Sequence, residues 1–178
     1  MIQHAFTRKY NKITNVLRES VIIENSDDNS SISINNAIWD TGASISSINS
    51  VLASKLNLKP IGYVNIQTAN GECTVPQYII NVKFNENLEI ERLIVTGNNL
   101  VNIDMLLGMD IINHGQFTIS NSGFTMISFI VPSTDMTDYV DLVNAKNKRL
   151  LKGMGRNALC PCGSGKKIKD CCGPKYGV

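Results

Sequence analysis

The strongest indication of the fold is the stretch Ile38-Trp39-Asp40-Thr41-Gly42-Ala43-Ser44. Its apolar beginning is typical of a strand, and the following Asp-Thr-Gly consists of residue types that favour turns. Such a sequence presents a carboxylate at the end of a strand. An ordinary turn is the alternative interpretation, because a short Asp-Thr-Gly sequence also arises by chance. The surrounding sequence has to decide between the two.

Alternating polar and apolar residues on both sides of this stretch predict short strands, and Asn70-Gly71 is a strong signal for a hairpin. Residues 1–12 are polar and basic, and we expect them to be poorly ordered or to form an edge segment. The pattern favours a mainly β protein with a closed or partly closed barrel and two short helices. The expected strands are residues 13–24, 31–39, 63–69, 73–84, 88–95, 116–119 and 124–131, and the expected helices are residues 48–56 and the turn after Asp110.

A second motif, Leu106-Leu107-Gly108-Met109-Asp110, repeats the sequence of apolar residues, glycine and short helix that surrounds Asp40. Together the two motifs make residues 13–132 resemble the retropepsin-like aspartic peptidases, which include the retroviral proteases and their bacterial and eukaryotic relatives. The resemblance implies a retropepsin-like barrel that hydrolyses peptide bonds.

The resemblance also implies roles for individual residues. Asp40 is expected to be the catalytic aspartate, Thr41 to form hydrogen bonds across a dimer, and Gly42 to let the backbone approach the substrate. The hairpin at Ala69, Asn70 and Gly71 is expected to be a flap that binds substrate over the cleft. Gly108 is expected to pack against the loop that carries Asp40.

The sequence departs from the retroviral pattern at Met109, where retroviral enzymes have an arginine that pairs with an acid just after the active loop. The region around Ser44 and Met109 cannot make that ion pair. The chemistry needs two carboxylates that share one proton, yet the body contains one Asp-Thr-Gly and is too short for two lobes. We therefore expect a two-fold homodimer that supplies one Asp40 from each subunit.

Other nucleophiles have less support from the sequence. Cys73 is isolated within an expected strand, so we expect a buried structural thiol there. His4 belongs to the N-terminal arm, and His114 lies beside a glycine at a helix end. A pairing of Cys73 with a histidine is open, without further support.

Charge is distributed unevenly along the 178 residues. Residues 21–145 have a net charge of −9, whereas residues 146–178 carry nine bases and one acid. A basic tail can contact nucleic acid, a ribosome or an acidic protein, and it can also be a solvated segment. The apolar positions between Pro132 and Gly153 predict a linker helix, so we expect residues 133–154 to connect the body to the tail.

Four of the five cysteines lie close together near the C-terminus, at Cys160, Cys162, Cys171 and Cys172. Four thiolates in a glycine-rich segment suit a tetrahedral Zn²⁺ ion, and nearby lysines lower thiol pKa values. A redox-labile or disordered tail is the alternative. Residues 155–178 closely resemble the SEC-C motif, the zinc module at the C-terminus of the export ATPase SecA. This resemblance implies that the four cysteines bind a structural zinc ion and that the module docks to proteins or ribosomes.

We therefore expect a homodimeric aspartic endopeptidase that acts on extended peptides and is tethered to a partner or substrate by its zinc motif. One alternative is an inactive adaptor that binds peptides or proteins through the dimer cleft. Another is an adaptor for RNA or ribosomes in which the basic tail dominates. No apolar run approaches the roughly 20 residues that span a bilayer, and the N-terminus lacks a secretory signal. We accordingly expect a cytoplasmic, bacterial protein with no membrane partner.

Overall fold

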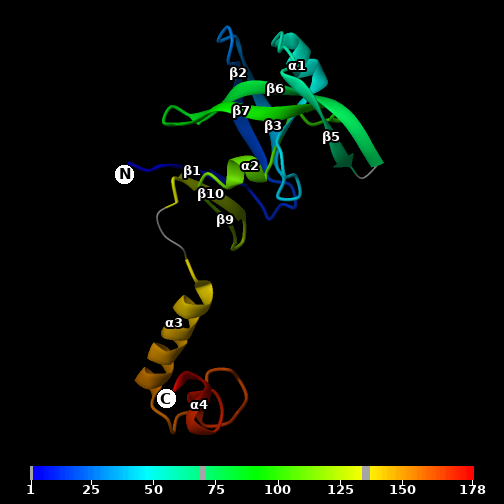
Figure 1. Ribbon diagram of the computed structural model, residues 1–178. Coiled ribbons are helices and arrows are strands. Elements are labelled where there is room, and N and C mark those ends of the chain that lie inside the picture. The colour runs from blue at the N-terminus through cyan, green and yellow to red at the C-terminus, as the bar shows by residue number, and fades with distance from the viewer. Residues whose placement is uncertain (1, 69–70, 134–136) are drawn as a thin grey trace. The chain divides into compact units, whose positions relative to one another are not determined.

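The computed structural model describes residues 2–68, 71–133 and 137–178, which form two compact units, residues 1–133 and 134–178 (Figure 1). Each unit is described by itself below. The first unit is built almost entirely of strands, and the second of helices and turns. Within the described ranges, no helix combines the length and the apolar character needed to cross a membrane.

The first unit contains a barrel whose strands follow the order β2-β3-β8-β4-β7-β6. A further antiparallel pairing between β2 and the second half of β6 closes the ring, and β5 pairs with the first half of β6. The mainly β fold with a closed barrel that the sequence predicts is therefore confirmed. The strands are β2 (Arg18–Asn25), β3 (Ser31–Trp39), β4 (Ser47–Asn49), β5 (Gly62–Thr68), β6 (Gly71–Asn85), β7 (Leu88–Asn98) and β8 (Met105–Leu107).

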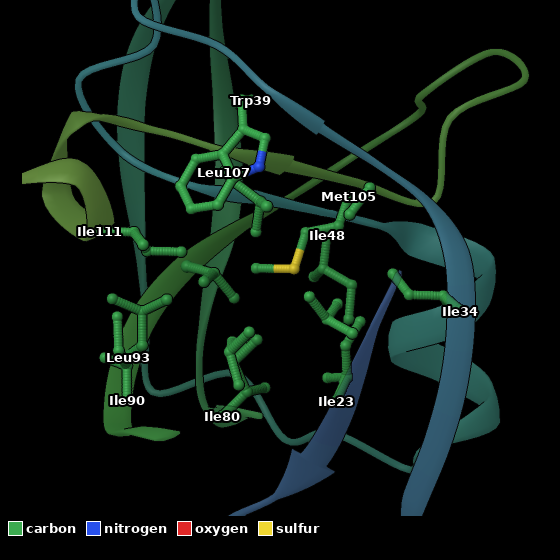
Figure 2. Close-up of a cluster of buried hydrophobic side chains, with 14 of the residues drawn as sticks. Ile23, Ile34, Trp39, Ile48, Ile80, Ile90, Leu93, Met105, Leu107 and Ile111 are labelled. Carbon is green, nitrogen blue, oxygen red and sulfur yellow. The ribbon is translucent and has the colours of Figure 1, made fainter. Parts of the chain in front are cut away.

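Strict alternation of side chains explains the interior of the barrel. In β2, Val21 and Ile23 are buried while Ile22 between them is 40% exposed, because successive side chains of a strand point to opposite faces. Figure 2 shows Ile23, Ile80 and Met105, which come from three different strands, pointing into the common core. Burial of these aliphatic side chains is the main stabilising contribution to the barrel.

A second sheet, with the strand order β1-β10-β9, joins the barrel through an aromatic cluster. It consists of β1 (His4–Lys9), β9 (Gln116–Asn121) and β10 (Thr125–Val131). The Trp39 ring at the end of β3 lies 4.7 Å from Phe117 and 5.5 Å from Phe84, measured between ring centroids. Phe6 of β1 and the fully buried Phe129 of β10 complete the cluster. The cluster fixes the end of the strand that leads into Asp40.

Two predicted elements differ from the observed ones, and for residues 1–12 the structure shows one of the two expected alternatives. The strand expected from residue 13 begins only at Arg18, and Ile13 and Val16 are exposed. Residues 1–12 are not simply an arm, because they include β1, which is the edge segment among the two alternatives. The helix expected from Ile48 is α1 (Ser50–Lys55), since the Asn49 side chain accepts the Val51 N–H as an N-cap and Ile48 belongs to β4.

The second unit contains α3 (Tyr139–Met154), the 3-10 helix η1 (Ile168–Asp170) and α4 (Gly173–Tyr176). Asp138 caps α3 by accepting the N–H groups of Val140 and Asp141. A helix is thus present in the segment expected to be a linker, and it belongs to the second compact unit. A small core of Leu151, Cys160 and Ile168 holds the unit together, so it has little apolar burial of its own.

Candidate active site and metal site

Asp40 lies directly after β3 at one end of the barrel. Its N–H donates to the Leu107 carbonyl oxygen over 2.9 Å, which continues the parallel pairing of β3 with β8. The side chain is half-buried and lines a cleft in the first unit. The strand pair therefore fixes the backbone of Asp40 and leaves its carboxylate accessible.

The residues after Asp40 form a tight turn around its side chain. The Gly42 N–H donates to Asp40 Oδ1 over 2.9 Å, and the Ala43 N–H donates to the Asp40 carbonyl oxygen over 3.2 Å. A Cβ atom on Gly42 would lie 3.2 Å from Asp40 Oδ1, which is a tight contact. Thr41 is exposed, and its hydroxyl has no hydrogen-bond partner among the residues that the structure describes.

Gly108, between β8 and α2 (Met109–Ile112), packs against the loop of residues 40–46, which we call the Asp40 loop. The Met109 N–H donates to the Ala43 carbonyl oxygen over 2.8 Å. A Cβ atom on Gly108 would lie 2.8 Å from that same oxygen and 3.1 Å from the carbonyl carbon of Ile45. Only glycine allows the two backbone segments to approach so closely.

A cleft of about 1140 Å³ opens above Asp40. Its walls come from the Asp40 loop and the start of α1, from the facing ends of β5 and β6, and from the end of β7 with the residues after it. Gly71, one of the three expected flap residues, lines this cleft and pairs with Thr68 across the hairpin. The other two, Ala69 and Asn70, lie outside the described residues.

The cysteine cluster lies in the second unit. The Sγ atoms of Cys160, Cys162, Cys171 and Cys172 all lie within 4.8 Å of one another. Four sulfur atoms at 2.3 Å around a tetrahedral Zn²⁺ ion would be about 3.8 Å apart. The separations of 3.5 Å between Cys162 and Cys171 and 3.9 Å between Cys171 and Cys172 agree with that distance. The donor set therefore fits a metal such as zinc.

The thiols in this cluster have strongly divergent pKa values. Hydrogen bonds from the side chain and backbone of Ser164 lower the pKa of Cys162 to about 6. Hydrogen bonds with the other three cysteines, led by Cys160, raise the pKa of Cys172 to about 12. Four neighbouring sulfur atoms cannot all ionise easily without a positive charge among them, and a divalent cation supplies that charge.

Two descriptions of known families match parts of this chain. Residues 32–114 match the family described as "gag-polyprotein putative aspartyl protease", and residues 156–174 match the SEC-C motif. The crystal structure of a retropepsin-like aspartic protease from Rickettsia conorii superposes with a TM-score of 0.50. It is 19% identical and covers 73% of this chain and 96% of its own. The first unit has the retropepsin-like fold, and the second carries a SEC-C motif.

Two further comparisons differ in extent. The structure of the EIAV protease complexed with the inhibitor HBY-793 is 17% identical, with a TM-score of 0.44, and covers 58% of this chain and 89% of its own. The protein translocase subunit SecA of Clostridium acetobutylicum is 73% identical over 26 residues, or 15% of this chain. This chain spans only 3% of the length of that SecA, so the likeness is confined to the SEC-C motif.

The sequence did not reveal how the retropepsin-like unit fastens its Asp40 loop. Asp110 was visible in the second motif but had no assigned role. In the structure its carboxylate accepts the Ser46 N–H and the Ser46 hydroxyl, and Ser46 Oγ in turn accepts the Gly108 N–H. An acid two residues after the motif glycine is the signal that could have found this contact.

The expectation for Cys73 was wrong. This cysteine is exposed rather than buried, because it lies in the outer part of β6 that pairs with β5 and lines the cleft. Side chains of a strand alternate between its two faces, so every second residue of this hairpin faces solvent. A single cysteine in the sequence does not show which of the two faces packs against the core. Its partner across the hairpin is Ile66.

Proposed function

We propose that this protein is a homodimeric aspartic endopeptidase in which each subunit contributes one Asp40 to a shared active site. The observation that carries the proposal is the position of Asp40, held at the end of β3 with its carboxylate open to a large cleft. The retropepsin-like fold of the first unit supports it.

The chemistry requires two carboxylates that share one proton. Two adjacent Asp40 side chains cannot both ionise easily, so one is a carboxylate and the other a carboxylic acid. The carboxylate takes a proton from water as that water attacks the peptide carbonyl carbon, while the acid donates its proton to the carbonyl oxygen. The resulting tetrahedral diol breaks the C–N bond, and a proton passes to the leaving amine.

The second carboxylate has to come from a second copy, because the first unit contains a single Asp-Thr-Gly. A two-fold axis through the site would place both loops symmetrically. The exposed hydroxyl of Thr41 supports this arrangement, since it is free to bond across the axis. Gly42 lets the backbone approach the substrate closely, and retropepsin-like proteases are typically dimers.

The proposed substrate is an extended peptide segment. Backbone groups along the cleft could pair with it as an additional strand, which gives affinity for many sequences. The hairpin of β5 and β6, with Ala69, Asn70 and Gly71 at its turn, is the proposed flap over the bound peptide. The volume of the cleft in one subunit, about 1140 Å³, leaves room for several side chains.

The SEC-C motif is the proposed tether. Cys160, Cys162, Cys171 and Cys172 would hold a zinc ion that stabilises the fold of this small module and takes no part in the hydrolysis. Residues 146–178 carry nine bases, so an acidic protein surface or a ribosome is the proposed partner. The cytoplasm is the proposed location.

Cleavage of a mixed peptide library, read by mass spectrometry between about pH 4 and 7, tests the proposal. We expect the Asp40→Asn variant to lose activity by roughly 10²–10⁴-fold, the contribution of an essential acid–base group. Asp27→Asn, which alters an exposed aspartate in a turn, is the matched control and should retain activity. Specific activity should rise with enzyme concentration as dimers form.

Two results would contradict the proposal. Cleavage that survives in the Asp40→Asn variant would show that another group performs the reaction. Absence of cleavage by folded, dimeric wild-type protein would favour an adaptor that binds peptides in the same cleft.

A further inference from the structure

Three polar side chains from two neighbouring strands meet on one wall of the cleft. The hydroxyls of Ser47 in β4 and Thr96 in β7 lie 2.6 Å apart, and the two residues pair in the parallel ladder between these strands. The side-chain nitrogen of Asn98 donates to Ser47 Oγ over 2.9 Å and to Thr96 Oγ1 over 3.1 Å. All three residues line the cleft that contains Asp40. We call Ser47, Thr96 and Asn98 the polar wall.

Strand pairing relates the polar wall to the position of Asp40. Leu106 of β8 pairs with Ser47 on one side and with β3 on the other, and it also lines the cleft. Neighbouring strands of a sheet lie about 4.8 Å apart, so Ser47 and Thr96 are about 10–14 Å across the sheet from β3, which ends at Asp40. An extended peptide advances about 3.3 Å per residue, so the polar wall can reach a side chain within about four residues of the cleaved bond.

The polar wall leaves one hydrogen-bond acceptor for a ligand. The Asn98 amide nitrogen donates to both hydroxyl oxygens, and the Thr96 hydroxyl in turn donates to the Ser46 carbonyl oxygen over 3.4 Å. Asn98 Oδ1 has no hydrogen-bond partner among the described residues. In that part of the chain the buried side-chain polar atoms without a partner are Glu19 Oε2 and Trp39 Nε1, so Asn98 Oδ1 is open to solvent.

We propose that the polar wall binds an uncharged substrate side chain that donates a hydrogen bond to Asn98 Oδ1. The matching side chains are those of asparagine, glutamine, serine and threonine. This inference rests on the proposed function, because it assigns a sequence preference to the same cleft.

Other kinds of side chain fit the polar wall less well. An apolar side chain would exclude water from Asn98 Oδ1 and leave that oxygen without a partner. A carboxylate has no proton to donate to it. An ammonium group would lose hydration beside Ser47 and Thr96, which are 6% and 1% exposed, and the polar wall contains no carboxylate to compensate for that loss.

The remaining charges of the cleft also disfavour acidic substrate side chains. Asp40 and Glu72 are the charged members among the described residues that line it, and none of these residues is a lysine, an arginine or a histidine. A carboxylate of the substrate would therefore meet like charge in the same cleft.

Cleavage of a mixed peptide library, sorted by amino acid at each position from the cleaved bond, tests the proposal. For the wild type we expect about three- to tenfold enrichment of the four polar residues at one position within four residues of that bond. Asn98→Leu has a similar size without a polar atom, so it should remove this enrichment and favour apolar residues at the same position. Asn87→Leu alters an exposed asparagine in the β6–β7 turn, outside the cleft, and should keep the wild-type profile.

Two results would overturn the proposal. One is a wild-type profile in which none of the four polar residues is enriched at any position within this range. The other is an Asn98→Leu variant that cleaves less or melts at a lower temperature but keeps the wild-type preference, because the polar wall would then only fasten β4 to β7.

A binding experiment separates failure of this proposal from failure of the proposed function. The same library is retained on immobilised Asp40→Asn protein, with and without Asn98→Leu, and the amino-acid composition of the bound peptides is compared. If the wild type cleaves no peptide, the proposed function fails and this comparison still decides the preference. Enrichment of the four polar residues that Asn98→Leu removes would support the proposal, whereas equal compositions would overturn it.

Discussion

Ser46 and Asp110 lock the Asp40 loop to the beginning of α2. The Asp110 carboxylate accepts the Ser46 N–H over 2.8 Å and the Ser46 hydroxyl over 2.7 Å, although the residues are 64 positions apart. A serine and an aspartate therefore fasten the Asp40 loop in this chain.

Replacement of Asp110 with asparagine should loosen this link. The carboxylate accepts from Ser46 through both oxygens and also from the Ile111 N–H, and an amide has only one oxygen with which to accept. We expect Asp110→Asn to lower the free energy of unfolding by about 1–3 kcal/mol. Peptide cleavage should fall about tenfold in kcat/KM, because the Asp40 loop is misplaced.

Urea unfolding and steady-state kinetics measure these two effects. Asp104→Asn is the matched control, because the Asp104 carboxylate has no hydrogen-bond or ion-pair partner among the described residues. Equal losses in the two variants would argue against a specific role for Asp110.

Replacement of Gly108 with alanine should displace the Asp40 loop. The added methyl group would meet the Ala43 carbonyl oxygen at 2.8 Å, and backbone on both sides must move. We expect a loss of about 1–3 kcal/mol in the free energy of unfolding, as for other overpacked sites, with a larger relative loss of cleavage. Gly153→Ala in α3 meets no atom within 4 Å and should instead stabilise its unit by about 0.5–1 kcal/mol. A fully active Gly108→Ala variant would contradict this account.

The closure of the barrel between β2 and β6 should depend on pH. The Lys83 ammonium, 2.7 Å from Glu24, and the Asn81 amide lower the pKa of Glu24 below its ordinary value of 4.5. The folded state therefore favours the carboxylate, and this contribution is present above pH 4.5 and disappears as the pH falls through the lowered pKa.

We accordingly expect Glu24→Gln to lower the free energy of unfolding modestly at neutral pH, with a difference from wild type that closes in acid. Denaturant unfolding between about pH 3 and 7 measures it. The control is Glu86→Gln, which alters an exposed carboxylate in the β6–β7 turn. A difference that grows in acid would contradict the assigned sign.

Loss of one cysteine should abolish metal binding by the SEC-C motif. We expect one zinc ion per wild-type chain by elemental analysis, and a large loss of that zinc in Cys172→Ser, because three sulfur atoms leave a tetrahedral site incomplete. Cys73→Ser is the control and should retain the metal, since Cys73 lies in the other unit. Removal of zinc should unfold the module and leave cleavage of short peptides unchanged. Full zinc in Cys172→Ser would show that these four cysteines are not the ligand set.

Much of the fold follows from local sequence. Alternation predicted most of the longer strands and Asn70-Gly71 predicted the hairpin, because period-two patterns and turn residues act over a few positions. The three-residue strands β4 and β8 are too short to show alternation and were not predicted. The edge strand β1 was harder to predict, since His4–Lys9 is polar and pairs with β10, more than a hundred residues away. The shift of the helix start from Ile48 to Ser50 depended on one cap, Asn49.

The candidate sites likewise contain residues that local motifs predict and contacts that they do not predict. Asp40 and the four cysteines belong to compact motifs, so their positions could be predicted. The contact of Ser46 with Asp110 joins two motifs that are 64 positions apart in the sequence, and only the folded chain shows it.

The most direct test of the central claim is a subunit-mixing experiment. Wild-type protein at a fixed concentration is incubated with increasing amounts of Asp40→Asn protein until subunits exchange, and peptide cleavage is then measured. Random pairing with one equivalent of the variant leaves about half of the wild-type subunits in fully wild-type dimers. The account predicts that activity falls to about half and continues to fall with further variant, while an equal mass of albumin has no effect. Activity that stays constant would contradict an active site shared between two Asp40 side chains.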